Sequence, residues 1–90
     1  MDPKEIAADY LDRGYVEETT FQNLHVGQRV HHSGQRYAYG GTGTATIERI
    51  FVNRNSAWAQ NYGRPDVELI VRRDDSTPGF WADYHTVVAS

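Results

Sequence analysis

Aromatic and arginine side chains in polar, glycine-containing segments are the residues of this chain best suited to recognition chemistry. The 90 residues include two tryptophans, six tyrosines and three phenylalanines. A core can absorb Phe21, Phe51 and Phe80, but several of the other rings lie in segments with the composition of loops. Interfaces favour tyrosine and tryptophan, which combine a large apolar face with a polar tip. The candidate binding residues are Tyr37, Tyr39, Trp58, Tyr62, Trp81, Tyr84, Arg36, Arg54 and Arg64. The alternative for each loop aromatic is that it folds back and closes one end of the core.

Catalytic and metal-binding patterns are weak by comparison. The chain has no cysteine, which excludes disulfides, thiolate metal sites and thiol catalysis. The neighbours His31 and His32 point to opposite faces of a strand and cannot both face one metal ion. Residues 40–44 are glycine-rich but lack the lysine and the following helix of a phosphate loop. The Asp74-Asp75 pair suits a solvated turn. We therefore expect no enzyme, no metal and no cofactor.

The formal charge of −3 is unevenly distributed along the chain. Residues 1–20 hold six acids against Lys4 and Arg13, a balance of −4. Residues 21–90 hold six acids against seven arginines, a balance of +1. The N-terminal acids are typical of a solvated helix face. The alternative is a lid or a docking surface for a basic partner.

The first residues predict a short helix with both ends marked. Asp2 can cap it, Pro3 suits its first position, and Glu5 completes a capping box. Gly14 is suited to the left-handed residue that ends a helix. A stripe of apolar residues at helical spacing must pack on the rest of the domain or on a partner. The stripe consists of Ile6, Ala7, Tyr10 and Leu11.

After Phe21 the pattern changes to that of strands and turns. The expected strands are Gln28–His32, Thr42–Asn53, Val67–Arg73, Phe80–Ala82 and Thr86–Ala89. The inward candidates of the second strand are Ala45, Ile47 and Phe51, and a bulge or bend is needed to bring Ile50 inward as well. Residues 33–41 are expected as a loop, residues 74–79 as a turn and Asp83–His85 as one 3₁₀ turn. The long connection Asn53–Pro65 has room for one helical turn capped by Ser56.

Two stretches carry a family resemblance. Val-Gly-Gln-Arg-Val-His-His at 26–32, followed by Gly-Thr-Gly-Thr-Ala-Thr-Ile at 41–47, resembles the opening strands of KOW, Tudor-like and CarD-type barrels of the SH3-like superfamily. Residues 80–84 and 87–88 are similar to their closing strands. The resemblance covers residues 24–90 and implies a mainly β fold. That fold is a five-stranded SH3-like barrel over residues 21–90, preceded by a short α-helix and linker over residues 1–20. An insert at residues 35–40 and a scarcity of basic residues depart from the KOW pattern.

Three functions agree with these features. The first is a non-catalytic module that binds a protein partner through the loop aromatics and arginines. The second, implied by the resemblance, is a nucleic-acid- or RNA-polymerase-associated module. The third is a self-assembling accessory protein of a larger particle, such as a phage. No apolar run approaches the roughly 18 residues of a membrane span, and no signal peptide opens the chain, so we expect a cytoplasmic protein with no membrane contact.

Overall fold

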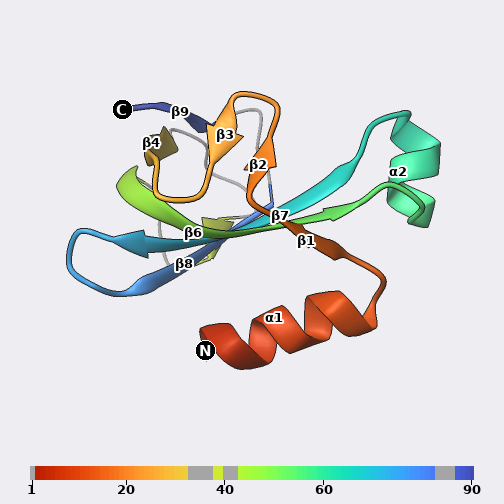
Figure 1. The fold of residues 1–90 in the computed structure, drawn as a ribbon, viewed down its shortest axis with the longest axis horizontal. Coiled ribbons are helices and arrows are strands. Elements are labelled where there is room, and N and C mark those ends of the chain that lie inside the picture. The colour runs from red at the N-terminus through yellow and green to blue at the C-terminus, as the bar shows by residue number, and fades with distance from the viewer. Residues whose placement is uncertain (1, 33–37, 40–42, 83–86) are drawn as a thin grey trace.

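The computed structural model describes residues 2–32, 38–39, 43–82 and 87–90, and its architecture is mainly β with a short N-terminal helix (Figure 1). The elements in chain order are α1 (Pro3–Asp12), β1 (Val16–Glu18), β2 (Thr20–Phe21), β3 (Leu24–His25), β4 (Arg29–His32), β5 (Ala38–Tyr39), β6 (Gly43–Asn53), α2 (Ala57–Tyr62), β7 (Asp66–Arg73), β8 (Pro78–Trp81) and β9 (Val87–Ala89). The 3₁₀ turn expected at Asp83–His85 lies outside the described residues.

One antiparallel seven-stranded sheet contains all five strands expected from the sequence, as β4, β6, β7, β8 and β9. Its order is β5-β8-β7-β6-β4-β9, and β1 also pairs with β6. The prediction of only five strands is wrong, because β1 and β5 extend this sheet while β2 and β3 form a separate pair. The prediction of a closed barrel is also corrected. Closure requires the terminal strands to hydrogen-bond to each other, and within the described residues β5 and β9 do not pair.

Strand β6 contains the expected bulge, which decides what its two faces bury. Its register with β7 shifts between Ile47 and Arg49. Before the shift the odd-numbered Ala45 and Ile47 face the main core, and after it the even-numbered Ile50 faces that core. An extra residue in one strand reverses the alternation of side chains between faces. Phe51 is therefore buried on the opposite face of the sheet, so its expected place beside Ala45 and Ile47 is wrong.

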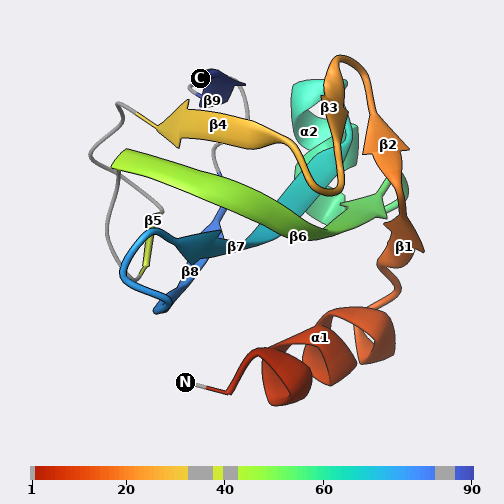
Figure 2. The same cartoon turned by 60° about the vertical axis from the view of Figure 1, so that its left-hand side comes forward.

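The main core lies between the sheet and the β2–β3 hairpin, which is on the side of the sheet away from α1 (Figures 1 and 2). Its members are Phe21, Leu24, Val30, Ala45, Ile47, Ile50, Val52, Val67, Leu69, Val71, Trp81 and Val87. Strand β7 shows the expected alternation, since Val67, Leu69 and Val71 all contribute to this core. The pattern predicted from its sequence is confirmed.

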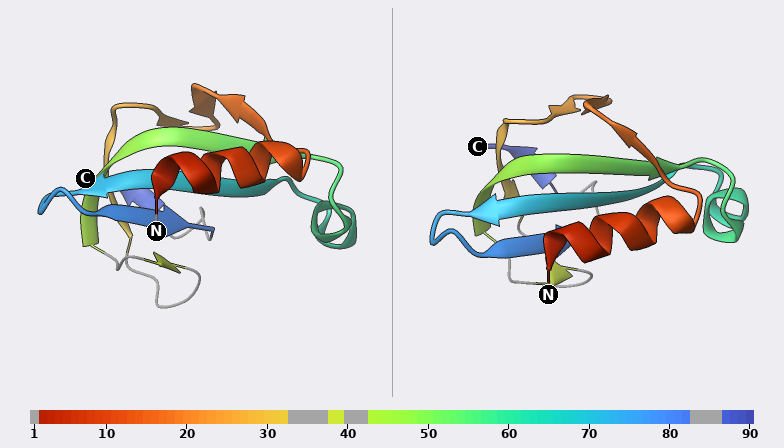
Figure 3. Two further views of the ribbon diagram at one scale, coloured as in Figure 1. Left: turned by 90° about the horizontal axis from the view of Figure 1, so that it is seen from below. Right: turned by 60° about the horizontal axis from the view of Figure 1, so that its bottom comes forward.

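Helix α1 packs along the other face of the sheet and creates a second, smaller core (Figure 3). The helix begins as expected, with Asp2 accepting a hydrogen bond from the backbone N–H of Lys4. Ala7 and Tyr10 are buried, and the Tyr10 ring lies 5.2 Å from that of Phe51. Leu11 is 47% exposed, so its expected burial is wrong. The contact with the sheet covers a narrower arc of the helix than the predicted stripe.

The segment between α1 and β4 is more regular than expected. Strand β1 pairs with the end of β6, with Val16 opposite Val52 and Glu18 opposite Ile50. The N-terminal segment expected as a helix and linker therefore also supplies a strand to the sheet. Similarly, Ala38 and Tyr39 form β5 where the sequence predicted a loop. Strands of two or three residues are too short to show an alternating pattern.

Candidate functional site

Helix α2 occupies the connection between β6 and β7, at the end of these strands away from the β7–β8 turn (Figures 1 and 3). The Ser56 side chain caps it as predicted, by accepting a hydrogen bond from the Ala59 backbone N–H at 3.0 Å. Ala59 is buried and anchors the helix. Gly63 ends it in the left-handed conformation at φ +67°, which glycine adopts without the steric cost of a Cβ.

Two exposed aromatic rings and one guanidinium group come together on this helix. Trp58 and Tyr62 are four residues apart, so they lie on one face of the helix, with ring centroids 4.9 Å apart. After the turn at Gly63, the Arg64 guanidinium carbon lies 5.3 Å from the Trp58 ring centroid, within cation–π range. Trp58 is 37% exposed and Tyr62 is 64% exposed. Trp58, Tyr62 and Arg64 are named here the α2 patch.

The polar groups of the α2 patch have no partners within the part of the chain that the structure describes. The Trp58 indole N–H, the Tyr62 hydroxyl and the Arg64 guanidinium form no hydrogen bond there, and Arg64 forms no ion pair there. Their contacts are made by ring faces and by the positive charge. Indole and guanidinium groups donate hydrogen bonds and accept none. The patch therefore presents apolar surface together with unused donors.

Among the other candidate binding residues, Trp81 is not part of this patch. Trp81 is 0% exposed, with its ring 4.9 Å from that of His32, so its predicted place on a contact surface is wrong. Its strand lies between β5 and β7 in the sheet, and its side chain faces the main core. Tyr39 lies in β5 opposite Phe80. The remaining candidates Arg36, Tyr37 and Tyr84 lie outside the described residues.

Arg54 is close to the patch in sequence, but it is bound to a carboxylate. Its guanidinium donates to the Glu18 carboxylate at 2.6 Å, linking the end of β6 to β1. Arg49 donates to Glu17 at 2.6 and 2.7 Å and holds the pKa of that carboxyl below its usual value. Two acids of the N-terminal segment therefore neutralise two arginines of the sheet. This pairing reduces the charge asymmetry that the sequence suggested.

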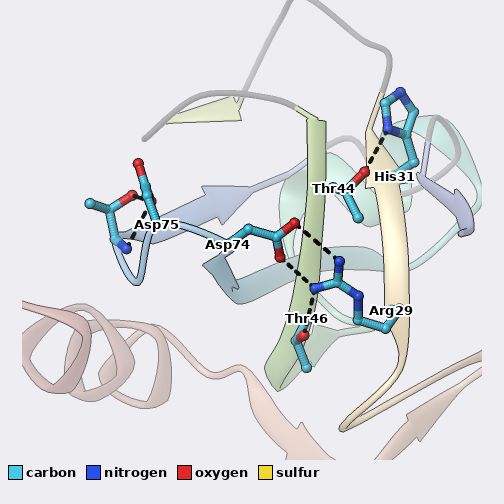
Figure 4. Close-up of polar contacts among 7 residues, drawn as sticks. Arg29, His31, Thr44, Thr46, Asp74 and Asp75 are labelled. Atoms are coloured by element: carbon cyan, nitrogen blue, oxygen red, sulfur yellow. Dashed lines mark hydrogen bonds and ion pairs between the residues drawn. The ribbon is translucent and has the colours of Figure 1, made fainter.

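Arginines on the outer face of β4, β6 and β7 are also paired. Arg29 donates to both carboxylate oxygens of Asp74 and to the Thr46 hydroxyl (Figure 4). The ion pair lowers the pKa of Asp74. The Arg72 guanidinium lies 3.5 Å from the Glu48 carboxylate. Arg13 on α1 pairs in the same way with Asp9 at 3.0 Å.

A polar layer between α1 and the sheet was not predicted from the sequence. The Tyr15 hydroxyl donates to Asp66 at 2.7 Å, and the Tyr10 hydroxyl donates to Glu68 at 3.4 Å. Burial, reinforced by the nearby Asp66 charge, raises the pKa of Glu68 to about 7. One sign of this layer was present in the sequence. Glu68 lies on the same face of its strand as the apolar Ile70, so another element had to cover that face. Only the docking of α1 identifies that cover.

The histidines show the expected opposite orientation. His31 is exposed, with its ring nitrogen 3.3 Å from the Thr44 hydroxyl, whereas His32 is buried (Figure 4). Within residues 2–32, 38–39, 43–82 and 87–90, no three His, Asp or Glu side chains gather as metal ligands would. In the same ranges, no helix has the length and apolar character needed to cross a membrane.

Comparison of the chain with family models, with curated proteins and with solved structures gives no match. The functional argument therefore rests on the α2 patch and its surroundings.

The Ser56 cap holds the patch in place, and its loss has a measurable cost. Ser56→Ala removes the cap of α2 and the hydroxyl that donates to Asp66 at 3.4 Å. We expect the free energy of unfolding to fall by about 1 kcal/mol, the usual cost of losing an N-cap. Urea unfolding followed by circular dichroism measures this change. Ser90→Ala, at the exposed chain end, is the control; an equal effect of the two substitutions would contradict the capping role.

Proposed function

We propose that this protein is a non-catalytic interaction module that binds a protein partner through the α2 patch. The observation that carries the proposal is the exposed Trp58–Tyr62 pair, whose rings contact each other in a tilted arrangement, with Arg64 over the Trp58 ring. Tryptophan, tyrosine and arginine are the residues that most often dominate binding energy at protein interfaces.

The patch is also positioned for recognition with little loss of conformational freedom. Ser56 and Gly63 fix the two ends of α2, and buried Ala59 attaches it to the domain. The rings constrain each other through their contact at 4.9 Å. Side chains that are ordered before binding lose less entropy when a partner arrives.

The fold proposed for this module is an SH3-like strand arrangement, open rather than closed into a barrel over the described residues, with an added N-terminal helix. Two features support it: the five expected strands lie in one antiparallel sheet, and β9 returns to pair with β4. The bulge in β6 supplies the bend that such a sheet needs.

The pairing of the arginines favours a protein partner over nucleic acid. Binding to a phosphate backbone depends on several cations that can replace counterions. In the described ranges, Arg13, Arg29, Arg49, Arg54 and Arg72 each lie within 4 Å of a carboxylate. This arrangement leaves few cations for a phosphate chain. It does not affect docking by aromatic rings.

Affinity capture from cells of the source organism tests the proposal. The bait proteins are the wild type, a Trp58→Ala/Tyr62→Ala variant and a Leu11→Ala/Val88→Ala control. The control removes two side chains that are 47% and 55% exposed at other places on the surface. We expect at least one protein to be enriched by the wild type and the control and lost with the patch variant. Equal capture by all three baits would contradict the proposal.

A further inference from the structure

The α2 patch has more hydrogen-bond donors than acceptors and more positive than negative charge. Both properties limit which partner it can bind. Its free polar groups are almost entirely donors: the indole N–H of Trp58 and the guanidinium of Arg64 cannot accept a hydrogen bond. Only the Tyr62 hydroxyl can both donate and accept. A partner that fits these groups must supply acceptors.

The charge around the patch is also one-sided. Residues 55–65 contain a single charged side chain, Arg64, and no acid. Just before this stretch, Arg54 is neutralised by Glu18; just after it, Asp66 accepts from Tyr15 and Ser56. Arg64 is thus a local positive charge without a carboxylate partner among the described residues, on a protein whose formal net charge is −3.

We propose that the α2 patch binds an acidic segment of its protein partner, in which an apolar side chain packs on Trp58 and Tyr62 and an adjacent Asp or Glu binds Arg64. This inference rests on the interaction function proposed above and specifies the partner's chemistry. A carboxylate accepts two parallel hydrogen bonds from a guanidinium group, a geometry that adds specificity as well as energy. The apolar side chain covers the exposed ring surface.

A peptide is favoured over a nucleic acid because the patch offers one unpaired cation. One guanidinium group matches one carboxylate in charge and geometry. A phosphate chain gains its affinity from several such contacts, each of which releases a counterion. The aromatic pair could stack on bases, but a single cation gives a phosphate chain little electrostatic support.

Binding of synthetic peptides to the full chain tests the inference directly. The probe is a twelve-residue peptide with one central Phe-Leu pair flanked by Asp and Glu. Matched peptides carry Gln or Lys in place of the acids, and a single-stranded dT12 oligonucleotide is the nucleic-acid arm. Amide chemical shifts measured by NMR give both affinity and location. We expect the acidic peptide to bind at residues 56–65, at least tenfold more tightly than the Gln peptide at low salt.

Substitutions in the chain assign the contacts. We expect Trp58→Ala to weaken binding of the acidic peptide at least tenfold. We expect Arg64→Gln to weaken binding of the acidic peptide about three- to tenfold and to leave binding of the Gln peptide unchanged. Arg72→Gln is the matched control, because Arg72 lies at the opposite end of β7. Its removal should leave binding unchanged.

The outcomes separate this inference from the broader function. Equal, Trp58-dependent binding of the acidic and Gln peptides would overturn the acidic preference and leave the interaction patch standing. If dT12 binds more tightly than the acidic peptide and this binding is lost with Trp58→Ala, the acidic-segment inference is overturned in favour of nucleic acid. Shifts of residues away from α2 would overturn the location. Failure of all probes would overturn the acidic-segment inference, whereas the capture experiment decides the interaction function independently.

Discussion

Replacing Trp81 with alanine is expected to lower the free energy of unfolding by about 3–5 kcal/mol, the range for removing a large aromatic side chain from a packed core. Trp81 is completely buried on the main-core face of β8, opposite Leu69 of β7. By contrast, Trp58→Ala should cost about 1 kcal/mol or less, because Trp58 is 37% exposed. Urea unfolding of both variants measures the difference.

The comparison distinguishes a core tryptophan from a surface tryptophan in the same chain. If Trp81→Ala does not fold, Trp81→Phe provides the measurement, with an expected cost of about 1–3 kcal/mol. A loss of stability from Trp58→Ala as large as the about 3–5 kcal/mol expected for Trp81→Ala would be consistent only with a much more buried Trp58. A loss above 3 kcal/mol for Trp58→Ala would remove the basis of the α2 patch.

Glu68 is expected to make the protein less stable as the pH rises from about 4.5 to about 7. Its folded-state pKa is raised to about 7 from an ordinary value of 4.5, so within this range the folded protein holds a proton that the unfolded chain has lost. Below this range the group is neutral in both states and has no effect. Above it the buried charge costs about 3 kcal/mol, from 1.36 kcal/mol for each unit between the two pKa values.

Glu68→Gln isolates this contribution, because an amide keeps the shape and the acceptor for Tyr10 but carries no charge. We expect the variant to exceed the wild type in stability by about 3 kcal/mol at pH 8 and to match it near pH 4. Urea midpoints measured across this range give the difference curve. Ion-paired carboxyls such as Glu17 and Asp74, whose pKa values are lowered, lose their contribution only at lower pH and cancel in the difference.

Glu48→Gln is the control for the same chemical change at a more exposed carboxyl, which pairs with Arg72. Its effect should be within about 1 kcal/mol, as for surface ion pairs. A Glu68→Gln difference that does not change with pH would contradict the burial of the Glu68 charge under α1.

Much of the local structure followed from the sequence, because local chemistry specifies it. Asp2 and Ser56 cap the two helices as expected, and Gly14 has the expected positive φ just after α1. The bulge in β6 was predicted because Ile50 could not otherwise share a face with Ala45. Each of these features involves residues that are neighbours in the chain.

The missed features depend on contacts between distant segments. Strand β1 exists because Val16–Glu18 hydrogen-bond with β6, and three residues are too few to show a period. The polar layer joins Tyr10 and Tyr15 to a strand more than 50 residues away. Leu11 is exposed because the sheet contacts only part of the helical stripe.

The candidate site shows the same division. Composition and spacing were enough to select Trp58, Tyr62 and Arg64, because an i,i+4 pair and a glycine turn bring them together locally. They could not exclude Trp81, whose burial depends on the whole sheet, nor Arg54, whose charge is neutralised from β1. The sequence by itself thus determined the helices, the five main strands and the content of the patch. Tertiary structure alone decided which aromatic rings and arginines stay free, because burial and ion pairing depend on segments far apart in the chain.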